Sequence, residues 1–237
     1  MSFLSWVVLS VVLVFTVYSI FSYFRVTGLL KESSALVKNA VPYEQHVAPE
    51  APTALFIGDS TGVGVGAAAN ESLAGRFGAE YSTWNVENLS VSGRKTTELL
   101  PTLKSLETGR YERIIIQVGG NDITYFSELG QLQRDIAAVL FEAKRVGRHV
   151  TFLSCGNVGN APIFPRPIAF IWTKRTRAVR SIFMEAAKEA DVSYVDLYRE
   201  GADDPFAREP LRYHASDLFH PSGEGYGLWY EDLKKAL

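Results

Sequence analysis

The chain has 237 residues, of which 24 are Lys or Arg and 26 are Asp or Glu, so its formal charge at pH 7 is -2. This balance provides no basic face for nucleic acid, and a hydrophobic content of 47% excludes a wholly disordered chain. Because Cys155 is the single cysteine, an internal disulfide and a multi-cysteine zinc site are also excluded.

An uncharged apolar run occupies residues 3–24. About 20 apolar residues cross a hydrocarbon layer of ~30 Å, so this run is long enough to span a membrane. A cleaved signal peptide is the alternative. The start MSFLSW lacks Lys and Arg, however, the apolar core is longer than the roughly 7–15 residues of a signal peptide, and no A-x-A cleavage site follows. We therefore expect residues 1–24 to be an uncleaved single-pass transmembrane anchor.

The charges after this run bear on its orientation. Arg25, Lys31 and Lys38 follow it, whereas only the α-amino group precedes it. The positive-inside rule then favours a cytoplasmic position for the rest of the chain. A periplasmic or extracellular position is the alternative, because a large domain can be exported despite three charges.

The remainder divides into a connecting segment and one domain. Residues 25–52 are expected to form a juxtamembrane helix or stalk and then a linker, since VPYEQHVAPEAPT at 41–53 contains three prolines. Residues 53–237 suffice for one domain with a substantial core.

Strand-like and helical patterns alternate within this domain. Helical periodicity appears at Glu128–Val146, Ile168–Ala190 and Gly225–Leu237. The five strand-like runs are Ala54–Ile57, Val86–Val91, Arg113–Val118, His149–Leu153 and Val192–Val195. Alternation of this kind predicts an α/β fold, a three-layer α/β/α sandwich around a central, mostly parallel, five-stranded sheet of the flavodoxin-like type.

Polar or glycine-rich segments follow three of these strands, and a fourth lies near the C-terminus. They are GDSTG at 58–62, SGR at 92–94, GGND at 119–122 and DLFH at 217–220. Ligands of parallel sheets bind beyond the carboxyl ends of the strands. Together the four segments supply a nucleophile, oxyanion donors, a base and a carboxylate.

The four segments resemble, in order, the motif blocks of the SGNH (GDSL-type) serine esterase/lipase hydrolase family. One departure is Thr61, where the family motif has Leu at a non-catalytic position. The resemblance implies that Ser60 is the nucleophile, His220 the general base and Asp217 the residue that orients the imidazole. It also implies an oxyanion hole made by the backbone N–H groups of Ser60 and Gly93 and the Asn121 side chain. No metal or cofactor is expected.

Some of these residues also fit other motifs. Gly58-x-Ser60-x-Gly62 also fits the nucleophile elbow of α/β-hydrolases, but only one predicted strand precedes it. The glycines of the segment 64–69 (GVGAAA) fit a dinucleotide fingerprint or close helix packing, and their distance from the strand end favours packing. His214 is a competing base, although no acid stands three residues before it.

Residues 160–172 are densely apolar and follow the fourth strand. One interpretation is an acyl-binding wall or lid, with Ile163, Phe164, Phe170 and Trp172 as substrate-binding candidates. Ordinary packing is the alternative. A basic cluster at Lys174, Arg175, Arg177 and Arg180, three of which share one helix side, is similarly either a solvated helix face or a contact for anionic lipid headgroups.

These observations together predict a membrane-anchored serine hydrolase that cleaves carboxylic esters or thioesters of lipid-like or other acyl compounds. Its expected partners are a small-molecule or lipid ester and the membrane, with no nucleic acid. O-deacetylation of a carbohydrate or envelope polymer, or acyl transfer to one, is the alternative enzyme function. A catalytically inactive membrane-bound binding module is the alternative from another class.

Overall fold

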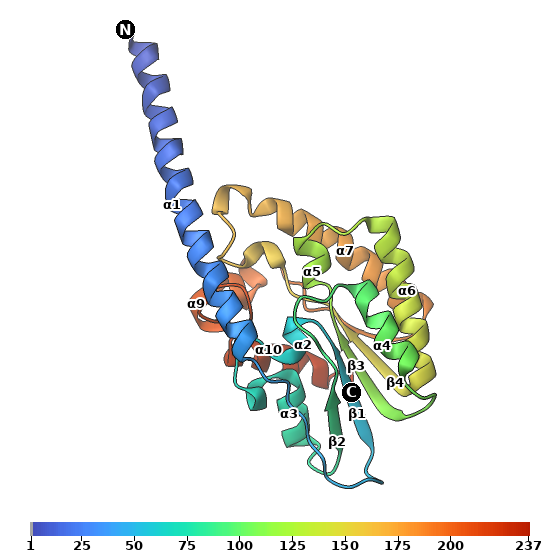
Figure 1. The fold of residues 1–237 in the computed structure, drawn as a ribbon. Helices are drawn as coiled ribbons and strands as arrows, with labels where there is room; N and C mark the ends of the chain where they lie inside the picture. The colour runs from blue at the N-terminus through green and yellow to red at the C-terminus, as the bar shows by residue number, and fades with distance from the viewer. Residues whose placement is uncertain (1) are drawn as a thin grey trace.

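A computed structural model describes residues 2–237 as one long helix, α1 (Phe3–Asn39), followed by an α/β domain (Figure 1). The domain contains a five-stranded sheet in the order β2-β1-β3-β4-β5, and every strand pairing is parallel. The strands are β1 (Thr53–Gly58), β2 (Asn85–Asn88), β3 (Tyr111–Gln117), β4 (Gly147–Leu153) and β5 (Ser193–Val195). The predicted α/β fold with a five-stranded sheet is confirmed.

Helices cover both faces of the sheet. On one face lie α4 (Leu100–Ser105), α6 (Leu129–Val146) and α7 (Phe170–Glu189), and on the other lie α3 (Leu73–Glu80) and α10 (Gly223–Lys234). The shorter helices are α2 (Ser60–Val63), α5 (Gly120–Thr124), α8 (Pro205–Arg208) and α9 (Pro210–Tyr213). Most of these shorter helices lie in the connections where the predicted motif blocks occur.

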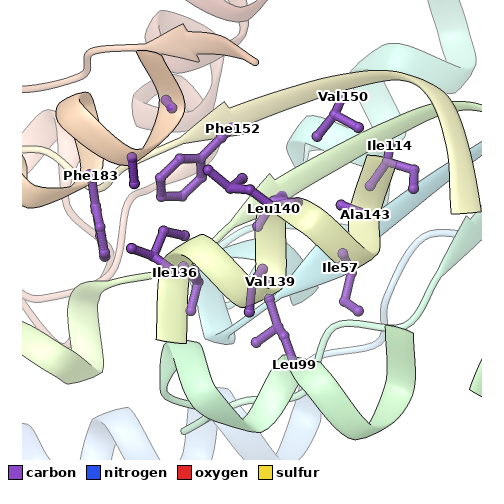
Figure 2. Close-up of a cluster of buried hydrophobic side chains, with 14 of the residues drawn as sticks. Ile57, Leu99, Ile114, Ile136, Val139, Leu140, Ala143, Val150, Phe152 and Phe183 are labelled. Carbon is purple, nitrogen blue, oxygen red and sulfur yellow. The ribbon is translucent and has the colours of Figure 1, made fainter. Parts of the chain in front are cut away.

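The core follows from alternation along the strands. In β3, Ile114 and Ile116 face α6 and α7, whereas Ile115 faces α3 and α10, and all three are fully buried. A strand buried on both faces is expected in a parallel sheet. Figure 2 shows the α6 side of this core, where Ile136, Leu140 and their neighbours along one helix stripe pack onto the sheet.

Two strands are shorter than predicted. The second is predicted over Val86–Val91, whereas β2 runs from Asn85 to Asn88. The Asn88 Oδ1 accepts a hydrogen bond from the Ser90 N–H (3.1 Å), and its Nδ2 donates to the Gly62 carbonyl (3.0 Å). The N–H groups of Leu89 and Val91 still donate to the Phe56 and Gly58 carbonyls of β1, at 2.8 and 3.1 Å, so the chain stays beside β1 after β2 ends. The fifth strand begins one residue later than predicted, at Ser193.

Helix α1 has two halves that lie in different surroundings. Its apolar half (residues 3–24) projects away from the domain, whereas its docked half (residues 25–39) continues the same helix alongside the domain (Figure 1). Among the described residues, α1 is the one helix long and apolar enough to cross a membrane, with a mean hydropathy of 2.3 in its most apolar window. A single-pass anchor and a signal sequence both have this property.

The segment after α1 is tied to the domain. Gln45 exchanges backbone hydrogen bonds with Val86 of β2, at 3.0 and 2.8 Å. Tyr43 packs against Gly78 of α3 so closely that a Cβ at this glycine would lie 2.6 Å from the ring. Residues 25–45 therefore follow the surface of the domain rather than forming a free stalk.

Candidate active site

The first motif block forms a sharp turn between β1 and α2. Gly58 is required here, since a Cβ at this position would lie 1.9 Å from the carbonyl oxygen of Gln117. Asp59 caps α2, accepting hydrogen bonds from the Thr61 N–H (2.9 Å) and hydroxyl (2.7 Å). The turn places Ser60 at the carboxyl edge of the sheet, where it is 8% exposed.

The structure brings Ser60, His220 and Asp217 together. The Ser60 Oγ lies 2.9 Å from His220 Nε2, and His220 Nδ1 lies 2.6 Å from an Asp217 carboxylate oxygen. The Asp217 carboxylate also accepts the backbone N–H groups of Phe219 and His220, both at 3.0 Å. Burial raises the pKa of Asp217, but the hydrogen bonds and charge of His220 and the two backbone N–H groups outweigh burial and lower that pKa below its usual value.

Gly66 allows the loop that carries His220 to lie close to the chain that follows Ser60. Gly66 has a φ of +97°, and a Cβ there would lie 2.4 Å from the Pro221 carbonyl oxygen and 2.8 Å from the Ala215 Cβ. Only a residue without a side chain allows this approach. The glycines of segment 64–69 therefore serve close packing, and the dinucleotide alternative has no support in this geometry.

Three donors face the space beside Ser60. The backbone N–H groups of Ser60 and Gly93 donate to no group within residues 2–237. The Asn121 side chain donates one N–H to the Arg94 carbonyl at 3.0 Å, which leaves its second N–H free. Gly93 has a φ of +87° with no atom near its missing Cβ, so its backbone conformation accounts for glycine there.

Asp122, in the same motif block as Asn121, has a structural role. Its carboxylate accepts hydrogen bonds from the Thr96 N–H (2.9 Å) and hydroxyl (2.7 Å) and from the Ser127 hydroxyl (2.8 Å). These bonds connect the loops that follow β2 and β3, and so fix Asn121 relative to Gly93.

Two cavities meet at Ser60, Asn121, Phe219 and His220. The first, the deep cavity, continues into the domain past Asn157, Leu197, Phe206, His214 and Trp229. The second, the helix groove, runs beneath α1 past Leu30, Ser33, Val37, Tyr125, Ile163 and Phe164. An ester bound at Ser60 thus has separate space for its acyl and alcohol parts.

His214 does not contact Ser60. Its Nδ1 donates to the Pro210 carbonyl at 3.0 Å, and its ring lines the deep cavity. Burial lowers the pKa of His214 to about 4, so the ring is neutral at pH 7. Cys155 also lines the deep cavity, and burial raises the pKa of its thiol.

The four predicted substrate-binding residues divide into two pairs. Ile163 and Phe164 line the helix groove. Phe170 is 66% exposed and lines neither cavity. Trp172 stacks on Phe164, with ring centroids 4.1 Å apart, and supports it from behind.

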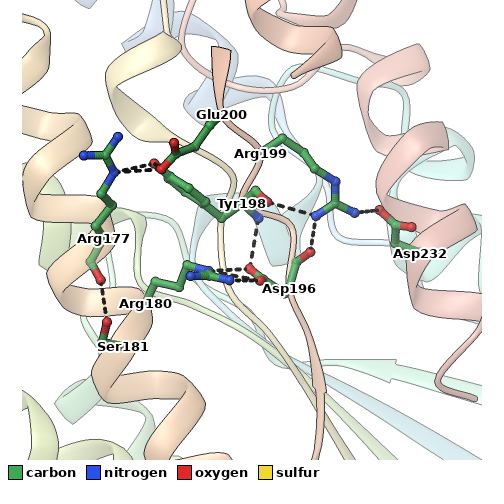
Figure 3. A network of polar contacts seen from close by, with 8 residues as sticks. All are labelled: Arg177, Arg180, Ser181, Asp196, Tyr198, Arg199, Glu200 and Asp232. Carbon is green, nitrogen blue, oxygen red and sulfur yellow. Dashed lines mark hydrogen bonds and ion pairs between the residues drawn. The ribbon is translucent and has the colours of Figure 1, made fainter. Parts of the chain in front are cut away.

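Two residues of the basic cluster on α7, Arg177 and Arg180, form ion pairs. Arg177 Nε lies 2.9 Å from the Glu200 carboxylate, and Arg180 pairs with Asp196 (Figure 3). Both guanidinium groups therefore have acidic partners on the chain that follows β5. This arrangement agrees with the solvated-face alternative rather than with lipid headgroup binding.

The contribution of α1 to the site was absent from the sequence prediction. Leu30, Ser33 and Val37 are spaced by three and four residues, so they share one helix face, and that face lines the helix groove. The spacing is visible in the sequence, but nothing there shows which part of the domain it contacts.

Known structures share this fold. A member of the lipolytic G-D-S-L family from Veillonella parvula superposes with a TM-score of 0.64 at 15% identity, covering 79% of this chain and 98% of that chain. The psychrotrophic esterase EstA from Pseudoalteromonas sp. gives 0.57 at 17% identity, with 78% and 95% covered. An acetylxylan esterase from Geobacillus stearothermophilus gives 0.53 at 17% identity, with 81% and 96% covered. Such identities show a common fold only.

Comparison at the level of sequence gives the family. No curated protein matches the chain significantly. The family model described as GDSL-like lipase/acylhydrolase matches residues 56–228, which is most of the chain and includes all four motif blocks. The chain therefore belongs to the GDSL-like lipase/acylhydrolase (SGNH) family and is an esterase-type hydrolase of carboxylic esters.

Proposed function

We propose that this protein is a membrane-anchored serine hydrolase that cleaves lipid-like acyl esters, with Ser60, His220 and Asp217 as its catalytic triad. The observation that carries the proposal is the continuous hydrogen-bonded chain from the Ser60 hydroxyl through both nitrogens of His220 to the Asp217 carboxylate, at 2.9 and 2.6 Å. A serine hydroxyl is a weak nucleophile until a neighbouring imidazole accepts its proton.

The reaction proceeds in two halves. The Ser60 Oγ attacks the ester carbonyl while His220 Nε2 takes the hydroxyl proton, and the Asp217 carboxylate stabilises the resulting imidazolium. His220 then gives that proton to the departing alcohol or thiol, which leaves an acyl group on Ser60. Water, deprotonated by His220, attacks this acyl-enzyme, and the carboxylic acid is released with Ser60 restored.

Stabilisation of the tetrahedral intermediates falls to the three donors beside Ser60. The negative oxygen that forms on the carbonyl is expected to accept the Ser60 and Gly93 N–H groups, which have no other acceptor among residues 2–237, and the free N–H of Asn121. One such donor contributes about 3–4 kcal/mol in a well-characterised serine hydrolase. Because two of them are backbone groups in fixed turns, they need no rearrangement during the reaction.

Labelling with a fluorophosphonate tests the nucleophile. The full chain, solubilised in detergent, should be labelled, and Ser60→Ala and His220→Ala should abolish or strongly reduce the labelling. Ser82→Ala, at an exposed serine on the loop after α3, is the matched control and should label like the unaltered protein. Full labelling of the Ser60→Ala variant would remove Ser60 as the nucleophile.

The membrane anchor is tested separately. Residues 3–24 contain no charged side chain, and none of the α1 side chains is buried in the domain. An anchored chain should remain in the membrane fraction after alkaline extraction, and its intact mass should include residues 1–24. Recovery of a soluble product that lacks these residues would establish a cleaved signal sequence instead. Protease digestion of sealed vesicles would then test the cytoplasmic position that the charge bias favours.

The deep cavity supports one alternative substrate class. Asn157 and His214 place polar atoms on its wall, and Asp204 accepts a hydrogen bond from the Asn160 side chain at its rim. These groups suit a hydroxylated alcohol such as a sugar, and the esterase from Geobacillus stearothermophilus is an acetylxylan esterase. Faster turnover of acetylated sugars than of octanoate esters would favour deacetylation.

A further inference from the structure

We propose, on the basis of the function proposed above, that the docked half of α1 is part of the substrate site. In this proposal Leu30, Ser33 and Val37 form the wall that holds the hydrocarbon chain of an ester entering from the bilayer. The helix that anchors the protein would then also select its substrate.

The docked half is fixed to the domain at points near both of its ends. Close to its start, the Arg25 guanidinium donates to the carbonyl oxygens of Pro162 and Ile163, at 2.7 and 3.4 Å. At its middle, the Ser216 hydroxyl donates to the Glu32 carboxylate at 2.6 Å. Beyond its end, Gln45 pairs with β2. These contacts hold the docked half beside the domain, where Figure 1 shows the lower part of α1.

The groove-lining face of the docked half carries two apolar residues and remains partly uncovered. Leu30 is 52% exposed although it lines a groove that also contains Ser60, Gly93, Asn121 and His220. A leucine placed over a nucleophile and three hydrogen-bond donors, without being packed into the core, is available to contact a ligand. Phe164 and Phe219 complete the apolar walls on the domain side.

The position of the groove along α1 identifies its occupant. Arg25 is the first charged residue after the apolar half, so it marks the level at which the helix would leave the hydrocarbon layer. Leu30 and Val37 follow it by five and twelve residues, or roughly 7.5 and 18 Å along the helix axis. Ile163, whose carbonyl contacts Arg25, also lines the groove. The groove therefore begins at the membrane surface and ends beside Ser60, as a path for an acyl chain requires.

The test compares esters of different chain length. Full-length protein reconstituted in phosphatidylcholine vesicles would be assayed with p-nitrophenyl acetate, whose acyl part ends in a single methyl group, and with p-nitrophenyl octanoate. Leu30→Ala and Val37→Ala should each raise KM for the octanoate about five- to tenfold, because each truncation removes apolar contact with the chain. The KM for the acetate should change less than twofold, so the ratio of the two KM values should rise. Leu30→Trp, which narrows the groove, should shift the preference further towards acetate.

Leu29→Ala is the matched control, since Leu29 is adjacent on the same helix but does not line the groove. It should leave the ratio of the two esters unchanged. If Leu30→Ala and Val37→Ala hydrolyse acetate normally and show an unaltered KM for octanoate, the proposal for α1 is overturned while the triad stands. If the unaltered protein neither hydrolyses acetate nor reacts with a fluorophosphonate, the proposed function itself fails.

Discussion

The catalytic triad (Ser60, His220 and Asp217) and the helix groove meet at Ser60 but are built in different ways. Each side of the triad is shaped by contacts within a few residues, such as Asp59 capping Thr61 and Asp217 accepting the N–H of His220. The groove depends on contacts between α1 and segments more than 130 residues away, such as Arg25 with Ile163. The turns that carry the catalytic groups are thus set locally, although Ser60 and His220 themselves meet across 160 residues, whereas the contacts that position α1 beside the groove are long-range. Substitutions at the triad should affect all esters alike, whereas those in the groove should depend on chain length.

The largest expected effect is loss of the triad. Ser60→Ala and His220→Ala should each lower kcat on the order of 10⁴- to 10⁶-fold, and the double variant should be no slower than either, because the residues act as one unit. Rates with acetate and octanoate esters should fall by the same factor, which initial-rate kinetics would measure. A loss confined to one chain length would contradict the division between chemistry and selection.

The next largest effect is expected at the Asn121 side chain, which lines both cavities beside the triad. Asn121→Ala should lower kcat about 10²- to 10³-fold with little change in KM, because the donor acts on charge that develops in the transition state. Asn121→Asp, which has the same shape but no N–H, should be at least as slow. A kcat within threefold of the unaltered protein would show that Gly93 and Ser60 suffice.

The features that could be predicted from the sequence are those set by local physics. The buried stripe of α6 follows from helical periodicity, and the placement of Ser60 and Asn121 after strands follows from the parallel sheet. The hydrogen bond from the Asn88 side chain to the Gly62 carbonyl could not be predicted, because it joins residues 26 positions apart. Likewise, Phe170 and Leu30 are both apolar residues on helices, and only their tertiary position decides that Leu30 lines the groove while Phe170 does not.

A third prediction concerns the pH dependence of stability, which should depend on His214. With a folded pKa of about 4 and an ordinary value of 6.5, His214 binds a proton in the unfolded chain but not in the folded protein between these two pH values. The free energy of unfolding should therefore fall as the pH drops through this window, by up to about 3 kcal/mol. His214→Asn keeps a donor for the Pro210 carbonyl and cannot be charged, so its stability should decline less.

Thermal unfolding of the detergent-solubilised chain at several pH values between 4 and 7 measures this difference. The difference in thermal midpoint between His214→Asn and the unaltered protein should be smaller at acid pH than at pH 7. Parallel curves for His214→Asn and the unaltered protein would mean that His214 is accessible to protons in the fold, contrary to its 7% exposure.

The smallest effect is expected on α7, whose basic residues lie outside both regions. The Arg177 and Glu200 side chains are more than half exposed, and ion pairs in such surroundings contribute little to stability. Arg177→Gln should lower the thermal midpoint by at most about 2 °C. Hydrolysis of octanoate esters in vesicles should respond to anionic lipid as in the unaltered protein, because Arg177 is already paired with Glu200. A selective loss of activity on anionic vesicles would instead give α7 a part in membrane contact, and the groove beneath α1 would then share substrate capture with a second surface.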